Sequence, residues 1–533
     1  MPATHEVTNQ PPPLLGHDVF GTDRPLVEGV RRYGAATDAL SQLGRLAGSE
    51  QAQRWAVEAN THLPVLHTHD RYGHRIDEID FHPSWHALLD TAVSAGLHGA
   101  VWASNDPARH VRRAAGFYVW SQVEAGHGCP VSMTYAVVPA LRAAPELAAR
   151  YEPGLTSTSY DPGLRDPEAK AGLLAGMAMT EKQGGSDVRA NTTRAVPRGD
   201  GSWALTGHKW FCSAPMCDLF LVLARAPQGL SCFAVPRVLP DGTRNTFRLQ
   251  RLKDKLGNRS NASSEVEFED TTGWLVGEPG RGVPTIIEMV NLTRLDCVIG
   301  SAAAMRAALA QAVHHAAYRS AFGTRLREAP AMANVLADLA VESEAATVLM
   351  LRLAAAVDGG EVALARLALA AGKFWVCKRT PTVVAEALEC LGGNGYVEDS
   401  GLPRLYREAP LNSIWEGSGN VIALDVLRVL AREPSAVQAV LAEVGLSAGA
   451  DHRLDAAIKT LHTELAEPSP ARARRIASSL ALVLQGSLLV RFAPPYVADA
   501  FCASRLDGDW GHVPGTLPAG VDAGAIVDRA APV

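Results

Sequence analysis

The feature that most constrains the fold is the stretch 177–278, whose sequence pattern differs from that of both flanks. Within it, short alternating runs such as 203–206, 219–224 and 264–268 are separated by Gly, Pro and Asp residues. Alternation bounded by such residues is typical of strands joined by turns. The dipeptide Asp200-Gly201, directly ahead of the first run, predicts a hairpin in which both turn residues take positive φ. The stretch therefore predicts a β-domain.

Helical patterns flank this β-domain, because apolar residues there return at three- and four-residue spacing. The expected helices include 85–95, 108–122, 301–319, 332–357, 361–387, 451–465 and 471–490. The fold class that follows is mainly α with a central β-domain and an extra C-terminal helical subdomain. The expected domain boundaries are 1–175, 176–285, 286–432 and 433–533.

Length and charge narrow the class of protein. A chain of 533 residues exceeds what one hydrophobic core usually supports, and 47% hydrophobic with 20% charged residues is typical of a globular protein. A net charge of −6 gives no general attraction to nucleic acid or acidic membranes. The first residues lack a secretory signal pattern, and the apolar stretch 476–490 is too short to span a bilayer. We expect a cytoplasmic protein without membrane association.

Metal and disulfide chemistry have little support in the sequence. The eight cysteines are scattered and form no C-x-x-C pair, so neither a zinc site nor a disulfide framework is expected. A group of histidines raises the alternative of a metal site, but only His82 and His86 share helical spacing and no cysteine joins them. We therefore expect satisfied surface histidines and no metal. The group comprises His62, His67, His69, His74, His82 and His86.

The most informative segment is Met177-Ala-Met-Thr-Glu-Lys-Gln-Gly-Gly-Ser-Asp187, in which hydroxyl groups and paired glycines lie close together. Paired glycines let backbone N–H groups approach an anionic or carbonyl-rich ligand. Taken alone, Gly-Gly-Ser-Asp is most often an ordinary turn. The segment needs other motifs before it indicates a cofactor.

Four further motifs follow it in order: GHKWFCS at 207–213, RSAFG at 319–323, LGGNGY at 391–396 and IWEGSGN at 414–420. In this order and spacing the five segments resemble the acyl-CoA dehydrogenase family. The detail resembles its AidB-like adaptive-response flavoprotein branch. That second resemblance rests on TEKQGGSDV, LKDKLGNRSNAS, RLYRE, NSIWEGSGN, NQPPPL and FHPSWH.

The resemblance implies a helical domain, a β-barrel-like domain, a helical bundle and an added C-terminal helical subdomain. It implies bound FAD, a homotetramer built as a dimer of dimers, weak dehydrogenation of acyl-CoA, association with double-stranded DNA and protection of DNA against alkylation. Two alternatives stay open. One is a metabolic acyl-CoA dehydrogenase for a short or branched acyl-CoA without a DNA role. The other is a flavin-stabilised DNA-binding or scaffolding protein with vestigial chemistry.

By the resemblance, Glu416 is the base that removes the α-proton of an acyl thioester while the flavin accepts the β-hydride. That role requires a carboxylate in a mostly dry pocket, where burial raises its pKa. Without the resemblance, Glu416 would be interpreted as a cap of a helix starting near Asn420. The residues that match FAD contacts are Met179, Thr180, Gly185, Ser186, Phe211, Ser213, Arg319, Phe322, Gly392, Gly393, Ile414, Ser418 and Asn420.

Several positions qualify this match. Adjacent strand residues point to opposite faces, so only Phe211 is expected on the flavin, with Trp210 in the core. Arg319 and Phe322 match a turn that reaches the FAD of a neighbouring subunit. Arg294 matches a position often close to the family's active site. The adenosine cradle must differ from the family's pattern, because two positions that often carry Gln are occupied by Pro330 and Glu389.

DNA affinity depends mainly on Lys and Arg side chains that neutralise phosphates. From Leu441 onward the chain carries eight basic and ten acidic residues, a net charge of −2, so a strongly basic domain is absent. A local patch remains the candidate for phosphate contact, with an ordinary solvated helix face as the alternative. Its residues are Arg428, Arg472, Arg474, Arg475 and Arg491.

Overall fold

The structure is a computed structural model that describes residues 4–533. The chain forms two compact units, each assembled from separate parts of the sequence. Unit 1 contains the residues up to Glu50, Pro107–Val123 and Cys297–Val533, and unit 2 contains Gln51–Asp106 and Glu124–Asp296. The four predicted domains stay a prediction, since these two units follow compactness rather than sequence order.

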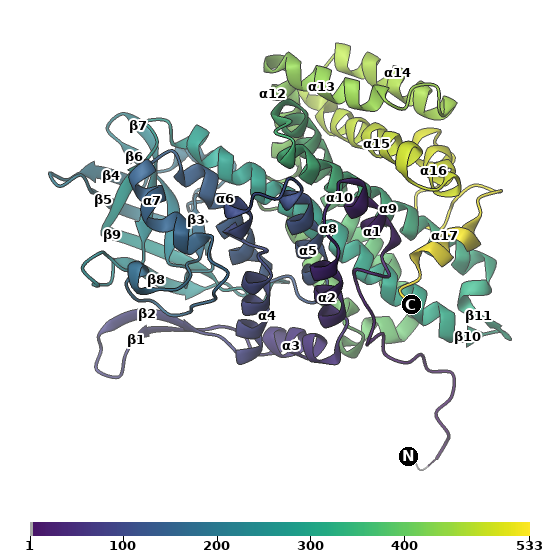
Figure 1. The fold of residues 1–533 in the computed structure, drawn as a ribbon, viewed down its shortest axis with the longest axis horizontal. Coiled ribbons are helices and arrows are strands. Elements are labelled where there is room, and N and C mark those ends of the chain that lie inside the picture. Colours follow the sequence, from purple (N-terminus) through teal and green to yellow (C-terminus); the bar gives the residue numbers. More distant parts are fainter. Residues whose placement is uncertain (1–3) are drawn as a thin grey trace. The chain divides into compact units, whose positions relative to one another are not determined.

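Unit 2 is built on a seven-stranded sheet (Figure 1). The strands are β3 (Ala175–Ala178), β4 (Arg194–Pro197), β5 (Trp203–Ser213), β6 (Leu219–Ala226), β7 (Gly229–Pro236), β8 (Phe247–Leu252) and β9 (Ser263–Val276). Strand β7 pairs with both β9 and β6, so the path β6-β4-β5-β9-β7 closes on itself. The predicted β-domain is therefore confirmed as a barrel.

Helices and one further hairpin complete unit 2. The helices are α3 (Glu50–Thr61, whose first residue belongs to unit 1), α4 (Pro83–Ser94), α6 (Gly128–Leu141) and α7 (Pro145–Leu155). The hairpin joins β1 (Val65–His69) to β2 (Arg75–Asp80). This hairpin is not predictable from the sequence pattern, because its polar, His-rich strands lack the apolar alternation that marks a half-buried strand.

The turn at Asp200-Gly201 forms a hairpin, but not the one expected. Strands β4 and β5 pair from Pro197 and Trp203, so five residues connect them. Gly201 has φ of 84°, whereas Asp200 is not among the positive-φ residues of the described chain. The Asp200 carboxylate instead accepts a hydrogen bond from the Ser202 backbone, which is an Asx turn. The hairpin is confirmed, and its predicted turn type is wrong.

Unit 1 is helical (Figure 1). In it, α9, α10, α12, α13 and α15 pack against one another, and α8 continues into it from unit 2. All the expected helices are confirmed, with ends shifted by a few residues and α8 starting well before the predicted residue. The helices are α1 (Arg24–Arg32), α2 (Asp38–Ala47), α5 (Arg109–Ser121), α8 (Gly282–Tyr318), α9 (Pro330–Asp358), α10 (Val362–Cys390), α11 (Leu402–Glu408), α12 (Gly419–Arg432), α13 (Pro434–Gly445), α14 (His452–Ala466), α15 (Ala473–Phe492), α16 (Pro495–Phe501) and α17 (Ala523–Ala530).

One segment, Pro470–Phe492, is long and apolar enough to cross a membrane by length and composition alone. It includes α15, and 61% of its apolar window is buried inside the protein. Helix α15 packs on α9, α10, α12, α13 and α14. Its apolar side chains are therefore used in the core of unit 1.

The histidine group lies on and beside the β1–β2 hairpin and makes local contacts. His67 and His74 lie against Asp80 and Asp70, and the rings of His62 and His82 stack 4.4 Å apart. Within residues 4–533, no group of three or more His, Cys, Asp or Glu side chains is arranged to hold a metal ion.

Candidate active site

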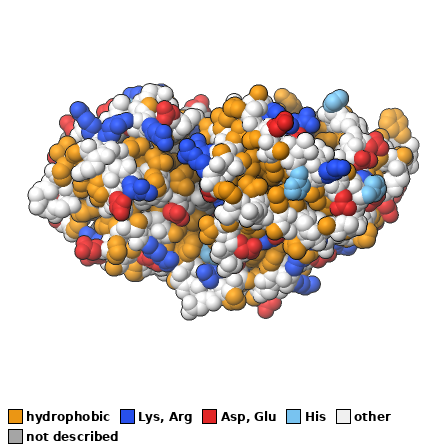
Figure 2. Space-filling model, turned by 90° about the horizontal axis from the view of Figure 1, so that it is seen from above, with side chains coloured by type: hydrophobic (Ala, Val, Ile, Leu, Met, Phe, Trp, Pro, Cys, Tyr) orange, Lys and Arg blue, Asp and Glu red, His pale blue; other side chains and the backbone are white. Residues whose placement is uncertain are grey.

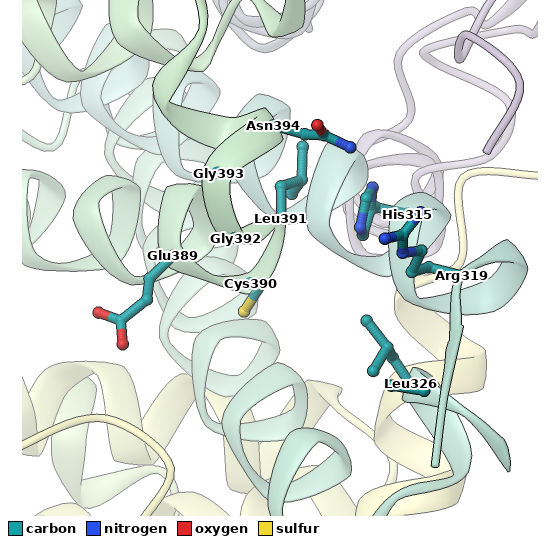
Figure 3. Close-up of a pocket in the computed structure, with 10 residues that line it drawn as sticks. His315, Arg319, Leu326, Glu389, Cys390, Leu391, Gly392, Gly393 and Asn394 are labelled. Carbon is teal, nitrogen blue, oxygen red and sulfur yellow. The ribbon is translucent and has the colours of Figure 1, made fainter. Parts of the chain in front are cut away.

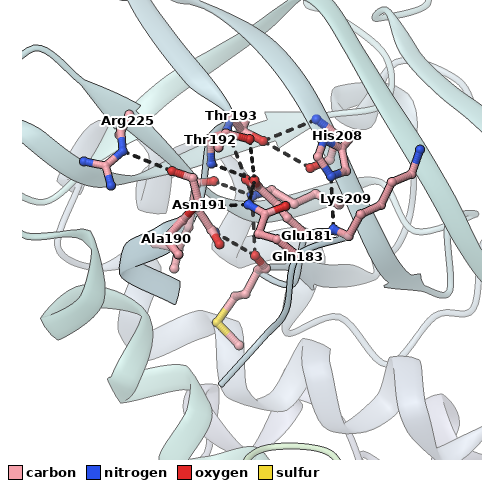
Figure 4. A network of polar contacts seen from close by, with 12 residues as sticks. Glu181, Gln183, Ala190, Asn191, Thr192, Thr193, His208, Lys209 and Arg225 are labelled. Atoms are coloured by element: carbon pink, nitrogen blue, oxygen red, sulfur yellow. Dashed lines mark hydrogen bonds and ion pairs between the residues drawn. The ribbon is translucent and has the colours of Figure 1, made fainter. Parts of the chain in front are cut away.

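The loop that begins at Thr180 is anchored by Glu181, whose side chain is fully buried in unit 2 (Figure 4). One carboxylate oxygen accepts from the Lys209 ammonium at 2.9 Å and from the Thr193 backbone at 3.1 Å. The other accepts from the backbone and hydroxyl of Thr192 and from the Gln183 amide. Because Lys209 lies in the barrel strand β5, this pair fixes the loop to the barrel.

Burial alone would raise the pKa of Glu181, but the Lys209 ammonium and the hydrogen bonds from Thr192 and Thr193 hold that pKa well below its usual range. Glu181 is therefore ionised at neutral pH and serves as an anchor. Thr180 is half-buried beside it, while Gly185 and Ser186 lie on the exposed part of the loop. A Cβ on Gly185 would lie 2.4 Å from the Thr180 hydroxyl, so any larger residue here would force the Thr180 side chain to move. Met179 is half-buried at the end of β3, where its carbonyl accepts from Asn191.

The aromatic segment of β5 does not alternate simply. The register with β9 shifts between Lys209 and Cys212, which is a β-bulge. Phe211 is 48% exposed, and Trp210 is half-buried rather than in the core. The expectation that Trp210 belongs to the core is wrong, because the bulge breaks strict alternation. Further along β5, the Ser213 hydroxyl lies 3.2 Å from that of Ser263.

Trp210 is surrounded by cations instead. The Lys253 ammonium lies 3.4 Å from the centre of the Trp210 ring and 4.6 Å from that of Phe211. Lys182 and Arg251 each lie 5.8 Å from the Trp210 ring. Cation–π attraction on this face explains how a large indole is held at the barrel surface.

A cavity of about 330 Å³ in unit 1 brings together two of the motifs (Figure 3). His315, Arg319 and Leu326 line one side, and the segment 389–394, including Glu389, Gly392 and Gly393, lines the other. The Arg319 guanidinium donates at 2.7 Å to the carbonyl of Asn9. The N-terminal segment thus holds Arg319 beside the cavity, a contact between residues 310 positions apart that no local pattern in the sequence indicates.

Phe322 stands at the tip of a two-residue hairpin between β10 (Ser320–Ala321) and β11 (Thr324–Arg325). Its φ is 52° and that of Gly323 is 84°, so both turn residues are left-handed. The side chain is fully exposed. A phenylalanine in this conformation is strained, and such strain persists mainly where function requires it.

Glu416 lies in the turn ahead of α12, in unit 1. Its φ is 57°, and that of Gly417 is 109°. The N-cap of α12 is Ser418, so the alternative that Glu416 caps this helix is wrong. The Glu416 side chain is half-buried, whereas Ile414 and Asn420 are exposed. The Asn420 side-chain oxygen accepts a hydrogen bond from Arg474 at 3.0 Å.

The other residues singled out from the sequence differ in their burial and in their contacts. Arg294 is buried on α8 within unit 2, and Pro330 is the first residue of α9. Arg491 is largely buried and pairs with Glu443 at 2.5 Å.

Three other arginines also have acidic partners. Arg472 and Arg475 share Glu464, and Arg428 pairs with Asp425. The Arg428 and Arg475 side chains are 59% and 72% exposed, so their guanidinium groups still reach solvent.

Family models match most of the chain in the same order as the structural elements. Residues 9–162 match the adaptive response protein AidB N-terminal domain. Residues 176–271 match the acyl-CoA dehydrogenase middle domain, and residues 280–431 match its C-terminal domain. The chain is 46% identical to AidB of Escherichia coli (strain K12) over 513 residues, which cover 95% of each chain.

The chain belongs to the AidB-like branch of the acyl-CoA dehydrogenase family. It is also 30% identical to acyl-CoA dehydrogenase family member 11 of Caenorhabditis elegans, over 88% of this chain and 81% of the relative. Family membership makes it an FAD-dependent oxidoreductase. The resemblance drawn from the five motifs is confirmed.

Solved structures agree on the fold. The crystal structure of Caenorhabditis elegans ACDH-11 in complex with C11-CoA matches with a TM-score of 0.84 at 27% identity, covering 94% of both chains. An acyl-CoA dehydrogenase complexed with FAD from Bacillus anthracis matches with a TM-score of 0.61 at 19% identity, covering 79% of this chain and 77% of the other. The predicted fold class, with FAD as the cofactor, is confirmed.

The residues present fit FAD in kind. An exposed aromatic ring and a nearby hydroxyl, Phe211 and Ser213, lie on β5 in unit 2. In unit 1, Arg319 and the main chain of Gly392 and Gly393 line a cavity, and a guanidinium suits a pyrophosphate because it donates two parallel hydrogen bonds. The role of each residue in holding the cofactor stays a prediction.

The left-handed conformation of Glu416 has a measurable cost. Both Glu416→Ala and Glu416→Gly remove the carboxylate, but only glycine adopts this φ without steric conflict. We expect the Gly variant to have a free energy of unfolding about 1 kcal/mol higher than that of the Ala variant, measured by urea titration. At Gln438, an exposed position inside α13, the order should reverse, because alanine favours a helix interior. Equal stabilities of the two Glu416 variants would contradict the strain.

Because the pKa of Glu181 is lowered in the folded protein, the contribution of Glu181 to the free energy of unfolding should depend on pH in the acid range. Since the folded pKa lies below the unfolded one, the stabilisation is complete above about pH 4.3 and is lost as the pH falls toward the folded value. Glu181→Gln should lower the free energy of unfolding by about 3–5 kcal/mol at pH 7, since it leaves the buried Lys209 uncompensated. The difference from the unsubstituted protein should shrink at pH 3.5.

Glu78→Gln is the matched control, because Glu78 forms an exposed pair with Arg244 in the same unit. It should change stability by less than about 1 kcal/mol at either pH. If the difference in free energy of unfolding between Glu181→Gln and the unsubstituted protein is the same at pH 7 and pH 3.5, the role of Glu181 as an ionised anchor is contradicted.

Proposed function

We propose that this protein dehydrogenates an acyl-CoA thioester with Glu416 as the base. The observation that supports the proposal is the turn at Glu416, where a carboxylate stands on a strained, left-handed backbone within the segment that matches the acyl-CoA dehydrogenase C-terminal domain. Bound FAD supplies the hydride acceptor. Glu416 removes the α-proton, so the thioester loses a proton and a hydride and becomes the enoyl thioester.

The residues of unit 2 have a separate role in this proposal. The loop 179–186, held by Glu181 and Lys209, presents Thr180 and Ser186 to the flavin. In this proposal Phe211 covers one face of the flavin ring system and so excludes water from it. The Ser213 hydroxyl donates a hydrogen bond to the same flavin ring system. The exposure of Phe211 supports this role, because an aromatic ring at a barrel surface is suited to stack on a planar ligand.

The cavity beside Arg319 supports an assembly of several copies. We propose that it receives the nucleotide half of FAD from a neighbouring subunit in a homotetramer, a dimer of dimers. The exposed Phe322 and the 83% exposure of Tyr396 support an apolar contact there. Glu389 lines this cavity at a position where the family often carries Gln. Recognition of the adenosine half therefore differs from the family's usual pattern.

The substrate class is an acyl-CoA. The similar Caenorhabditis elegans protein was solved in complex with C11-CoA, which makes a straight-chain thioester of that length the first probe. A short or branched acyl-CoA is the alternative. Comparison of both with FAD-loaded protein decides between them.

Glu416→Gln should retain FAD but lose at least about 100-fold in the rate at which an acyl-CoA bleaches the flavin anaerobically, since a positioned base typically contributes that much or more. Stopped-flow absorbance measures this rate. Glu433→Gln, at the other end of α12, should match the unsubstituted protein. If no acyl-CoA bleaches the unsubstituted protein, the dehydrogenase proposal fails.

A second function, association with double-stranded DNA in protection against alkylation, is favoured by the match to the adaptive response protein AidB N-terminal domain. The proposed phosphate contacts are the half-buried Arg472 and the exposed Arg474 and Arg475, together with Arg428. Glu464, the shared partner of Arg472 and Arg475, is buried, while both guanidinium groups still reach solvent, so a phosphate would bind them on the side away from that carboxylate. Arg491 is not included, because it is largely buried against Glu443.

The wider surface does not favour strong DNA binding. Figure 2 shows Lys and Arg side chains interspersed with acidic and apolar ones on the face seen from above. The net charge of −6 agrees with that distribution. Binding by a local patch should therefore be weak in one copy and stronger when several copies act together.

Replacing both Arg472 and Arg475 with Ala should weaken binding to duplex DNA at low salt and reduce the slope of log affinity against log salt by about 2. Arg474 is left unchanged because it contacts Asn420. Fluorescence anisotropy measures the effect, with the exposed Arg45→Ala as the control. If the unsubstituted protein has no affinity at low salt, the metabolic alternative without a DNA role is favoured.

A further inference from the structure

A buried lysine lies behind the turn that carries Glu416. Lys373, in the middle of α10, has 1% of its surface exposed. Its ammonium donates hydrogen bonds to the carbonyl of Trp415 at 2.8 Å and to that of Gly417 at 2.5 Å. Within residues 4–533, Lys373 forms no ion pair, so its charge is met by main-chain carbonyls.

The two carbonyls enclose the strained part of the turn. Glu416 and Gly417 are consecutive residues with positive φ, at 57° and 109°. The Trp415 carbonyl belongs to the peptide that precedes Glu416, and the Gly417 carbonyl belongs to the peptide that follows Gly417. Since the orientation of the first peptide is coupled to φ of Glu416, holding both peptides fixes the direction in which the Glu416 side chain leaves the backbone.

A neutral brace supports the same turn. The Trp415 indole N–H donates at 2.8 Å to the side-chain oxygen of Asn412, and the Asn412 amide donates at 3.2 Å to the hydroxyl of Ser301 on α8. This brace holds the Trp415 side chain. Lys373 holds the main chain instead, at the peptide before Glu416 and at the peptide after Gly417.

The chemistry of Lys373 is unusual for a residue with a purely structural role. Removing an ammonium from water is costly, and buried charges are ordinarily paired with an opposite charge. Lys209 and Lys170 follow that rule, since they pair with Glu181 and Asp218. The buried Lys373 ammonium instead contacts two main-chain carbonyls. Because burying it is costly, these contacts indicate that the conformation of the Glu416 turn is important for function.

We infer that Lys373 is a positioning residue for the base: its buried ammonium holds the peptide before Glu416 and the peptide after Gly417, and so orients the Glu416 carboxylate for proton abstraction. This inference rests on the proposed role of Glu416. It adds a residue that touches neither substrate nor cofactor and acts through the backbone of the turn.

The test compares Lys373→Met, Lys373→Arg and Glu416→Gln as FAD-loaded proteins with C11-CoA as the probe. Displacing a catalytic group by about 1 Å costs on the order of 100-fold in rate. Lys373→Met should therefore slow flavin bleaching about 100-fold, with the acyl-CoA dissociation constant and the FAD content nearly unchanged. Lys373→Arg, which restores a donor, should recover part of the rate. A loss of binding without a loss of rate would overturn the inference.

Two controls separate positioning from stability. Lys170→Met also removes a buried lysine, in unit 2 and outside the residues assigned to the reaction, and should lower the melting temperature without slowing bleaching. Gly417→Ala keeps Lys373 but disturbs the same turn, because alanine does not tolerate φ of 109°. It should slow bleaching as Lys373→Met does. If Lys373→Met fails to fold, the Gly417→Ala variant decides the test. A bleaching rate of Gly417→Ala within twofold of that of the unsubstituted protein then overturns the inference.

The crystal structure of Lys373→Met gives a readout that does not depend on activity. The positive φ at residue 416 should be lost or spread over several conformers. A folded Lys373→Met with bleaching within twofold of the unsubstituted rate, or with φ of Glu416 unchanged, overturns the inference. If Glu416→Gln bleaches at the full rate, the proposed function fails instead, and the φ readout still tests whether Lys373 holds the turn.

Discussion

The first cofactor motif depends on one buried interaction, the ion pair between Glu181 and Lys209. Glu181 is part of the motif, and Lys209 lies 28 residues later in the barrel strand β5. Since both side chains are fully buried, breaking the pair would leave an uncompensated charge. The pair therefore attaches the loop that carries Thr180 and Ser186 to the barrel. Because the barrel strands are rigid, this attachment restricts the motion of the loop.

The turn at Glu416 is held by the same kind of device with a different partner. Lys373 lies 42 residues before Trp415, and its ammonium binds carbonyls rather than a carboxylate. In both places a buried lysine from a regular element fixes a loop with irregular backbone. A reactive side chain can then stand on a loop and still keep one conformation, which catalysis by position and electrostatics requires.

The sequence predicted much of the architecture because the signals were local. Periodicity identified the long helices, and alternation identified the barrel strands. The errors arose where local rules were overridden: the bulge in β5 brought Trp210 out of the core, and the turn at Asp200 took five residues. A two-residue turn with both residues left-handed formed at Phe322-Gly323 and not at Asp200-Gly201. Phe322 occupies the position where Asn or Asp usually signals such a turn.

The sequence by itself determined the family, since five ordered motifs and the domain-length matches depend on residue identity alone. It also identified Glu416 as the candidate base. Only the tertiary structure decided what holds these motifs: Lys209 behind Glu181, Asn9 behind Arg319 and Lys373 behind the Glu416 turn. The physical reason is that a buried polar group must find its partner in space, and folding places that partner tens or hundreds of residues away along the chain.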